Sequence, residues 1–156
     1  MNTNKFFIFS VLSFVFSLVA FQASAQMQNP VSWKFETKKK AEGVYVFTAT
    51  ANVDKSWHIY SQNTGKGGPI ATNFVFKTNP LIKADGKVVE TGKLEKVYDK
   101  NFKTDVLFYS NSVTFTQTVT VKGKAKTNFA GTVEYMVCDD EQCLPPVKKA
   151  FDLKLQ

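Results

Sequence analysis

The sequence predicts an all-β protein in which two antiparallel sheets pack face to face, and three observations support this. Apolar and polar residues alternate wherever a period is readable, and no segment of helical length repeats every 3.6 residues. Turn-rich segments also separate eight or nine short candidate strands. This strand count and spacing favour an immunoglobulin-like antiparallel β-sandwich, with a closed barrel as the alternative.

The first 25 residues predict a secretory signal peptide. An early lysine precedes an apolar run from Phe6 to Phe21, and the small residues Ala23-Ser24-Ala25 follow. Serines interrupt the run, which is short for a bilayer span, so cleavage is favoured over anchoring. We therefore expect residues 1–25 to be removed and residues 26–156 to form one domain in an oxidising compartment outside the cytoplasm. In that oxidising compartment, paired cysteines indicate disulfide chemistry more than metal binding.

The charge of the chain disfavours nucleic acid as a partner. All 20 basic residues are lysine, and residues 26–156 carry 19 of them against 13 acidic residues, a net charge of +6. Base readout and bidentate phosphate recognition depend on arginine, which the sequence lacks. The lysines are scattered apart from Lys38-Lys39-Lys40, which we interpret as a solvated turn. A basic surface can still help the protein approach acidic partners or anionic lipid.

Two segments alternate most clearly. In Gly43–Val53 one face is apolar and carries Tyr45, Phe47, Ala49 and Ala51. In Ser112–Val121 four threonines share one face, and the other carries Val113, Phe115, Val119 and Val121, interrupted only by Gln117. Each strand should have one buried face and one wet face. Shorter candidate strands are Val31–Phe35, Trp57–Tyr60, Ala71–Lys77, Gly86–Glu90 and Asp105–Tyr109.

A charged stretch, Leu94–Phe102, is interpreted as a loop between two of these strands. It contains Tyr98 and Phe102. Aromatic side chains in such a loop often contact a partner, but they can equally close the end of a sandwich. The sequence alone leaves both interpretations open.

The only two cysteines, Cys138 and Cys143, lie between two apolar segments, Thr132–Val137 and Val147–Leu155. This arrangement predicts a hairpin whose facing thiols can reach disulfide geometry. The residues between them include Asp139, Asp140 and Glu141. Their negative charges should raise the pKa of both thiols and favour the oxidised pair.

The cysteine pair has two interpretations. As a structural link it is poorly placed, because closing so short a loop stabilises a fold by only about 2 kcal/mol. The first interpretation is therefore a pair that exchanges disulfides with other proteins. The alternative is a secreted sandwich that binds a partner through Tyr98, Phe102 and neighbouring loops, with a purely structural disulfide. Mild reductant separates the two, because only an exchange pair should be reduced with the fold intact.

Strand alternation also assigns roles within the pair. Val133, Tyr135 and Val137 form the expected core face, which places Cys138 on the opposite face with Glu134 and Met136. Cys143 follows the turn and precedes two prolines that keep the backbone extended and largely unpaired. We therefore expect Cys143 to form mixed disulfides and Cys138 to resolve them.

Other chemical candidates are few. His58 is the only histidine, and nothing in the sequence brings it near the cysteines, so we expect a packed or surface strand residue. Gly65-Lys66-Gly67-Gly68 lacks the pattern of a phosphate loop and is interpreted as a turn. No metal site is predicted.

The cysteine segment resembles the periplasmic N-terminal domain of the thiol:disulfide interchange protein DsbD. The resemblance rests on Cys138 to Pro146, with Val133-Glu134-Tyr135 before it and a double proline at its end. Trp57-His58-Ile59-Tyr60 and Val97-Tyr98-Asp99 follow the order of that family, so the resemblance spans roughly Val31 to Leu155. Only the cysteine hairpin is specific.

The resemblance implies an immunoglobulin-like protein-disulfide reductase with no cofactor beyond its own sulfurs. Cys138 and Cys143 would be the redox pair, with Cys143 forming the mixed disulfide. Val97 and Tyr98, with Phe102 nearby, would be the cap that shields the pair. Electrons would come from a membrane-embedded or thioredoxin-like donor and pass to periplasmic disulfide proteins. The spacer between the cysteines is one residue shorter than in the best-known member. The printed chain contains neither a transmembrane nor a thioredoxin-like domain, so separate partners are expected.

Overall fold

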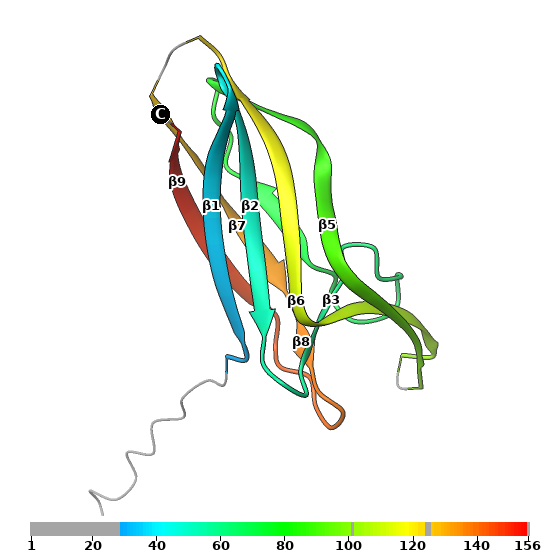
Figure 1. Ribbon diagram of the computed structural model, residues 1–156. Coiled ribbons are helices and arrows are strands. Elements are labelled where there is room, and N and C mark those ends of the chain that lie inside the picture. Colours follow the sequence, from blue (N-terminus) through cyan, green and yellow to red (C-terminus); the bar gives the residue numbers. More distant parts are fainter. Residues whose placement is uncertain (1–28, 101, 124–125, 156) are drawn as a thin grey trace, which may run out of the picture.

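The computed structural model describes residues 29–100, 102–123 and 126–155, and these residues form the predicted all-β immunoglobulin-like sandwich (Figure 1). The predicted signal peptide lies outside the described residues. The strands are β1 (Val31–Ala41), β2 (Val44–Val53), β3 (His58–Tyr60), β4 (Asn73–Phe76), β5 (Ile82–Asp99), β6 (Thr104–Val121), β7 (Thr127–Tyr135), β8 (Val137–Cys138) and β9 (Val147–Leu155).

The strands form two antiparallel sheets. The larger sheet has the order β1-β2-β6-β3-β8, and β5 also pairs with β6. The smaller sheet has the order β4-β7-β9. Strand β6 is central, because it pairs with β2, β3 and β5. It therefore links the body of the sandwich to the end that carries β3, β8 and the tip of the β5–β6 hairpin (Figure 1).

Several strands are longer than the sequence predicts. Asp105–Tyr109 and Ser112–Val121 belong to one strand, β6. The apparent break between them contains Asn111, whose φ of 65° is a local irregularity rather than a turn. Likewise Lys38-Lys39-Lys40 is not a turn but part of β1.

The expected loop Leu94–Phe102 is also largely strand. Residues 94–99 continue β5, which pairs with β6 through two register shifts, so only the tip of the hairpin is a turn. The sequence suggests a loop because β5 is an edge strand and carries charged residues at its exposed positions.

The core fills the space between the sheets with aromatic rings. Phe47 of β2 is fully buried, and its ring centroid lies 5.2 Å from that of Phe129 and 4.8 Å from that of Phe151 on the smaller sheet. The predicted apolar faces of β2 and β6 are buried. Gln117 is buried among them because its Nε2 donates to the carbonyl oxygens of Asp85 (2.8 Å) and Thr118 (2.9 Å).

A carboxylate fixes the chain where it leaves β3. Glu90 of β5 accepts hydrogen bonds from the Ser61 hydroxyl, the Gln62 backbone N–H at 3.0 Å and the Asn63 amide at 2.8 Å. Burial acts to raise the pKa of Glu90, but these hydrogen bonds outweigh burial and lower it. The network holds β3, and with it Tyr60, against the end of the sandwich.

Candidate functional site

The two cysteines form a disulfide at the tip of the predicted hairpin. The backbone N–H of Leu144 donates to the carbonyl of Val137 at 2.9 Å, and the N–H of Asp139 donates to that of Gln142, also at 2.9 Å. The Asp139 carboxylate accepts the backbone N–H groups of Glu141 (2.8 Å) and Gln142 (2.7 Å). These backbone hydrogen bonds lower the pKa of Asp139 and order the short turn between the cysteines.

The sulfurs of the pair differ in exposure. Cys138 is only 2 % exposed and packs with Tyr60 and Val106, whereas Cys143 is exposed. The expected access of Cys143 is therefore confirmed. Its role in forming mixed disulfides stays a prediction.

Alternation places Cys138 on the face opposite Val137, and that face is covered as well. Val137 and Cys138 are adjacent in sequence, yet both are buried. The chain changes sheets at Met136, since β7 ends at Tyr135 in the smaller sheet and β8 begins at Val137 beside β3 in the larger one. Val137 belongs to the core cluster between the sheets, whereas Cys138 lies in a separate cluster with Tyr60 and Val106. Alternation gives the face of Cys138 correctly, but it does not show that other elements cover that face.

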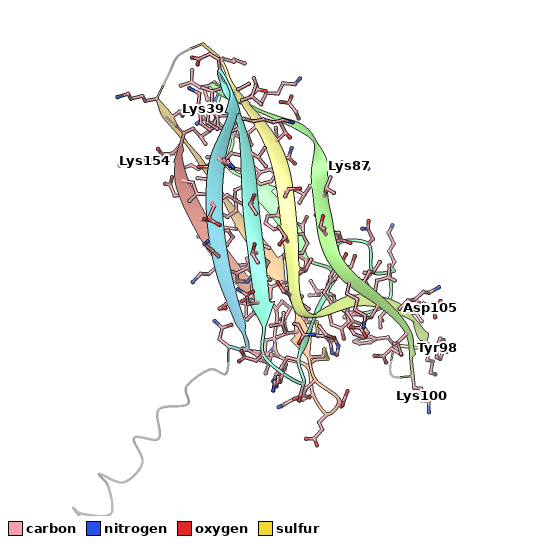
Figure 2. All side chains as sticks on the ribbon, in the orientation of Figure 1. Lys39, Lys87, Tyr98, Lys100, Asp105 and Lys154 are labelled. Carbon is pink, nitrogen blue, oxygen red and sulfur yellow. A yellow bond between two sulfur atoms is a disulfide. The ribbon has the colours of Figure 1, made fainter. Side chains whose placement is uncertain are left out.

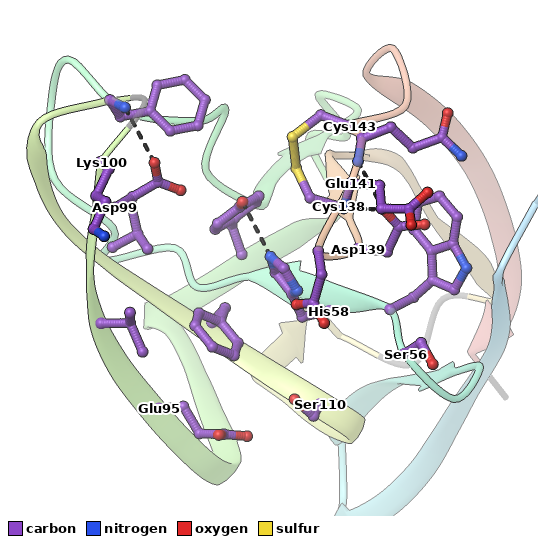
Figure 3. Close-up of a pocket in the computed structure, with 18 of the residues that line it drawn as sticks. Ser56, His58, Glu95, Asp99, Lys100, Ser110, Cys138, Asp139, Glu141 and Cys143 are labelled. Carbon is purple, nitrogen blue, oxygen red and sulfur yellow. Dashed lines mark hydrogen bonds between the residues drawn. A yellow bond between two sulfur atoms is a disulfide. The ribbon is translucent and has the colours of Figure 1, made fainter.

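A cavity of about 880 Å³ opens beside the disulfide (Figure 3). Both cysteines line it, and so do the three predicted cap residues Val97, Tyr98 and Phe102. Figure 3 places the disulfide on one side and Asp99 and Lys100 of the β5–β6 hairpin tip on the other. The structure thus brings the predicted sites together at one end of the sandwich.

Two of the cap residues are exposed. Val97 is 51 % and Tyr98 59 % exposed, and Figure 2 shows Tyr98 near the hairpin tip with Lys100 and Asp105. Phe102 is partly buried, and its backbone N–H donates to the Asp99 carboxylate at 3.1 Å. All three cap residues line the cavity that both cysteines line, so they face the disulfide across it.

Sequence reasoning missed His58 as a member of this site. In the ladder of β3 and β8, His58 is the direct partner of Cys138, so their side chains share one face. Its Nε2 lies 3.1 Å from the Tyr60 hydroxyl, and its ring centroid lies 4.4 Å from that of Phe108. The sequence offers only the weak signal of a single histidine in a short strand, because strand register between distant segments is not visible in it.

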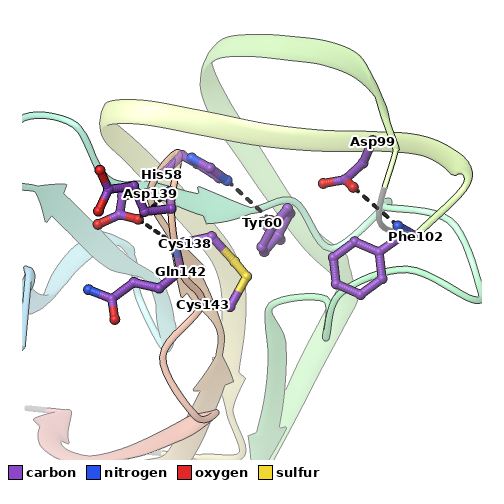
Figure 4. Close-up of a disulfide and its surroundings, with 9 residues drawn as sticks. His58, Tyr60, Asp99, Phe102, Cys138, Asp139, Gln142 and Cys143 are labelled. Carbon is purple, nitrogen blue, oxygen red and sulfur yellow. Dashed lines mark hydrogen bonds between the residues drawn. A yellow bond between two sulfur atoms is a disulfide. The ribbon is translucent and has the colours of Figure 1, made fainter.

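Burial affects the protonation of both partners in this hydrogen bond (Figure 4). It lowers the pKa of His58 from 6.5, although the charges of Asp140, Asp139, Asp99 and Glu95 oppose the shift. Burial, together with the charge of Asp99, raises the pKa of Tyr60 to about 12. At neutral pH the pair therefore consists of a neutral imidazole and a neutral phenol.

Negative side chains surround the cavity of a chain that is basic as a whole. The net charge of the full chain is +7. The cavity, in contrast, is lined by Lys100 and by six acidic residues, Asp54, Glu95, Asp99, Asp139, Asp140 and Glu141. No group of three or more potential metal ligands is found among the described residues. Nor do these residues include a helix with the length and hydropathy to cross a bilayer.

Three solved structures share the fold. The reduced DsbD N-terminal domain of Neisseria meningitidis is 14 % identical, with a TM-score of 0.57 over 81 % of this chain and 89 % of that one. The N-terminal periplasmic domain of ScsB from Proteus mirabilis is 13 % identical, with a TM-score of 0.57 over 85 % of this chain and 48 % of that one. A complex of the DsbD and PilB N-terminal domains from Neisseria meningitidis gives 12 % identity and a TM-score of 0.55 over 81 % and 87 %.

The search of curated proteins found no match. A family model does match, and it describes the N-terminal region of the thiol:disulfide interchange protein DsbD over residues 20–155. That range is most of the chain and includes both cysteines and all three cap residues. The chain belongs to the family of DsbD N-terminal domains.

Proposed function

We propose that the protein is a thiol–disulfide exchange module that passes reducing equivalents through Cys138 and Cys143. The carrying observation is the asymmetry of the disulfide, in which Cys143 is exposed beside an open cavity and Cys138 is buried. Attack on a disulfide needs access to one sulfur and a leaving group at the other. This geometry, together with family membership, supports exchange more than a structural link.

The exchange proceeds in two steps. A donor thiolate attacks the Cys143 sulfur, the bond to Cys138 breaks, and Cys138 leaves as a thiolate that takes up a proton. A second donor thiolate then attacks the donor sulfur of this mixed disulfide and releases reduced Cys143. Two electrons enter the pair. The reverse sequence delivers them to an acceptor disulfide, with Cys143 attacking first and Cys138 resolving.

The proposed partners are proteins. We infer a thioredoxin-like or membrane-embedded donor and periplasmic disulfide proteins as acceptors, and no cofactor beyond the sulfurs. A complex of DsbD and PilB N-terminal domains in Neisseria meningitidis supports a protein partner for this fold. Residues 1–25 are proposed to direct export and then to be removed, which the intact mass of the exported protein tests.

The proposal is tested by reduction of the folded protein. A thioredoxin-like reductant at micromolar concentration should reduce Cys138–Cys143 while the circular dichroism spectrum is unchanged, because attack occurs at an exposed sulfur. Alkylation and mass measurement report the reduced fraction. A disulfide that resists this treatment, and opens only when the protein unfolds, would support the alternative of a binding module with a structural disulfide.

We further infer that the cap residues limit access to the reduced pair. Tyr98 lines the same cavity as both sulfurs but is 59 % exposed, so Tyr98→Ala should change stability by only about 0.5 kcal/mol. The same change should speed alkylation of the reduced pair by iodoacetamide. Stopped-flow alkylation and thermal unfolding measure the two effects. Unchanged alkylation with a large loss of stability would make Tyr98 a packing residue.

A further inference from the structure

The buried position of Cys138 raises the question of where its proton goes. During delivery of electrons, the Cys138 thiol must lose its proton as it attacks the Cys143 sulfur of the mixed disulfide. Cys138 is 2 % exposed and packs against Tyr60 and Val106, so bulk water is largely excluded from its sulfur. Burial in such surroundings raises the pKa of a thiol. A base beside Cys138 would remove this obstacle.

His58 is placed to be that base. It is the direct cross-strand partner of Cys138, which puts the two side chains on one face of the sheet within reach of a proton transfer, directly or through one water. Both residues line the same cavity. Among the described residues, His58 is the only side chain beside Cys138 whose ordinary pKa lies near neutrality.

The hydrogen bond to Tyr60 orients the imidazole. When Nε2–H donates to the Tyr60 oxygen at 3.1 Å, Nδ1 carries the free lone pair that can accept a proton. Tyr60 is not a competing base, because its pKa of about 12 keeps it a phenol at neutral pH. After the transfer, Nε2–H keeps its acceptor.

Charged groups on neighbouring elements favour the protonated form of His58. Asp139 and Asp140 of the cysteine turn, and Glu95 and Asp99 of β5, lie close enough to stabilise a positive imidazolium. Ser110 of β6, the other cross-strand partner of His58, is uncharged. Burial keeps the free imidazole neutral, so it is available as a base at pH 7.

We propose that His58 accepts the proton of the Cys138 thiol when Cys138 resolves the mixed disulfide, and returns it when Cys138 is the leaving group. The inference rests on the proposed exchange function. In the resolving step the S–H bond of Cys138 breaks and its proton moves to His58. As the proton moves, the Cys138 sulfur forms the Cys138–Cys143 bond, and the partner sulfur leaves with the electron pair of the broken mixed disulfide.

The test isolates the resolving step with 5,5′-dithiobis(2-nitrobenzoate) as the acceptor. Mixed with an equal amount of the reduced protein, it should give two releases of coloured thiolate. The first depends on reagent concentration and reports attack by Cys143. The second does not, and reports displacement by Cys138. Because the leaving thiolate needs no proton, the second rate depends on deprotonation of Cys138.

The wild-type protein should show a second rate that is independent of pH between the pKa of His58 and that of the Cys138 thiol. In His58→Gln the second rate should be about 100-fold lower at pH 7 and should increase tenfold with each pH unit. The rate of the first phase should not change. Ser110→Ala removes a polar group from the same cavity without removing a base, and should behave like the wild type. Free imidazole should restore the second phase of His58→Ala, since an added base cannot restore lost packing.

The outcomes separate the two proposals. A wild-type protein without a second release would contradict the exchange function itself. The wild type could instead show both releases with a second rate that rises tenfold per pH unit. This result would overturn the role of His58 and leave the exchange function standing. The role of His58 would also be overturned if the second rate of His58→Gln matched that of the wild type. It would be overturned as well if imidazole did not restore the second phase of folded His58→Ala.

Discussion

In oxidised cell-envelope extract, the Cys138→Ser variant is expected to accumulate disulfide-linked complexes with partner proteins, whereas Cys143→Ser should accumulate few. The exposed Cys143 sulfur can form a mixed disulfide, and without Cys138 nothing in the chain resolves it. In Cys143→Ser the remaining cysteine, Cys138, is a residue only 2 % exposed in this structure, so we expect a bulky partner not to reach it. Non-reducing gels of both variants measure the ratio.

The control for this experiment is the double variant, which should give no adducts, and every adduct should disappear on reduction. The opposite ratio would reverse the roles of the two cysteines. Absence of adducts from both single variants would favour a structural disulfide over an exchange pair.

In the core, Phe47→Ala should lower the free energy of unfolding by about 3 to 5 kcal/mol. Phe47 is fully buried, and its ring joins the two sheets through Phe129 and Phe151. Truncation leaves a cavity that the surrounding rings of both sheets can fill only in part. Urea unfolding of the disulfide-bonded protein measures the loss.

Two further variants make this result specific. Phe47→Leu keeps most of the apolar volume and should lose much less stability, while Tyr98→Ala removes an exposed aromatic ring and should lose almost none. A loss below about 1 kcal/mol for Phe47→Ala would contradict the assignment of Phe47 to the centre of the core.

The sequence predicts much of this fold because alternation is a local property. The apolar faces of Gly43–Val53 and Ser112–Val121 are visible residue by residue, and both are buried in the structure. What fails is the length of strands. A strand that continues through a positive φ at Asn111, or along the exposed outside of a sheet as β5 does, resembles a turn or a loop in sequence.

The candidate site was predictable in part for the same reason. The cysteine pair and the cap residues are marked by local composition, and the structure brings them to one cavity. The burial of Cys138 and its pairing with His58 depend instead on where the chain changes sheets and on strand register. No single segment of the sequence shows the burial or the pairing, because both arise from pairing between strands that are distant in sequence.

The crossing between sheets at Met136 also limits how the chain can vary in length. Strand β8 pairs with β3 in one sheet, and β9 returns to pair with β7 in the other, so the residues between them are anchored on both sides. An insertion between Val137 and Val147 must be absorbed in the cysteine turn or shift a register. The tip of the β5–β6 hairpin has no such second anchor, because β5 pairs only with β6. Among related chains, length differences should therefore be tolerated at the cap far more readily than beside the sulfurs it faces.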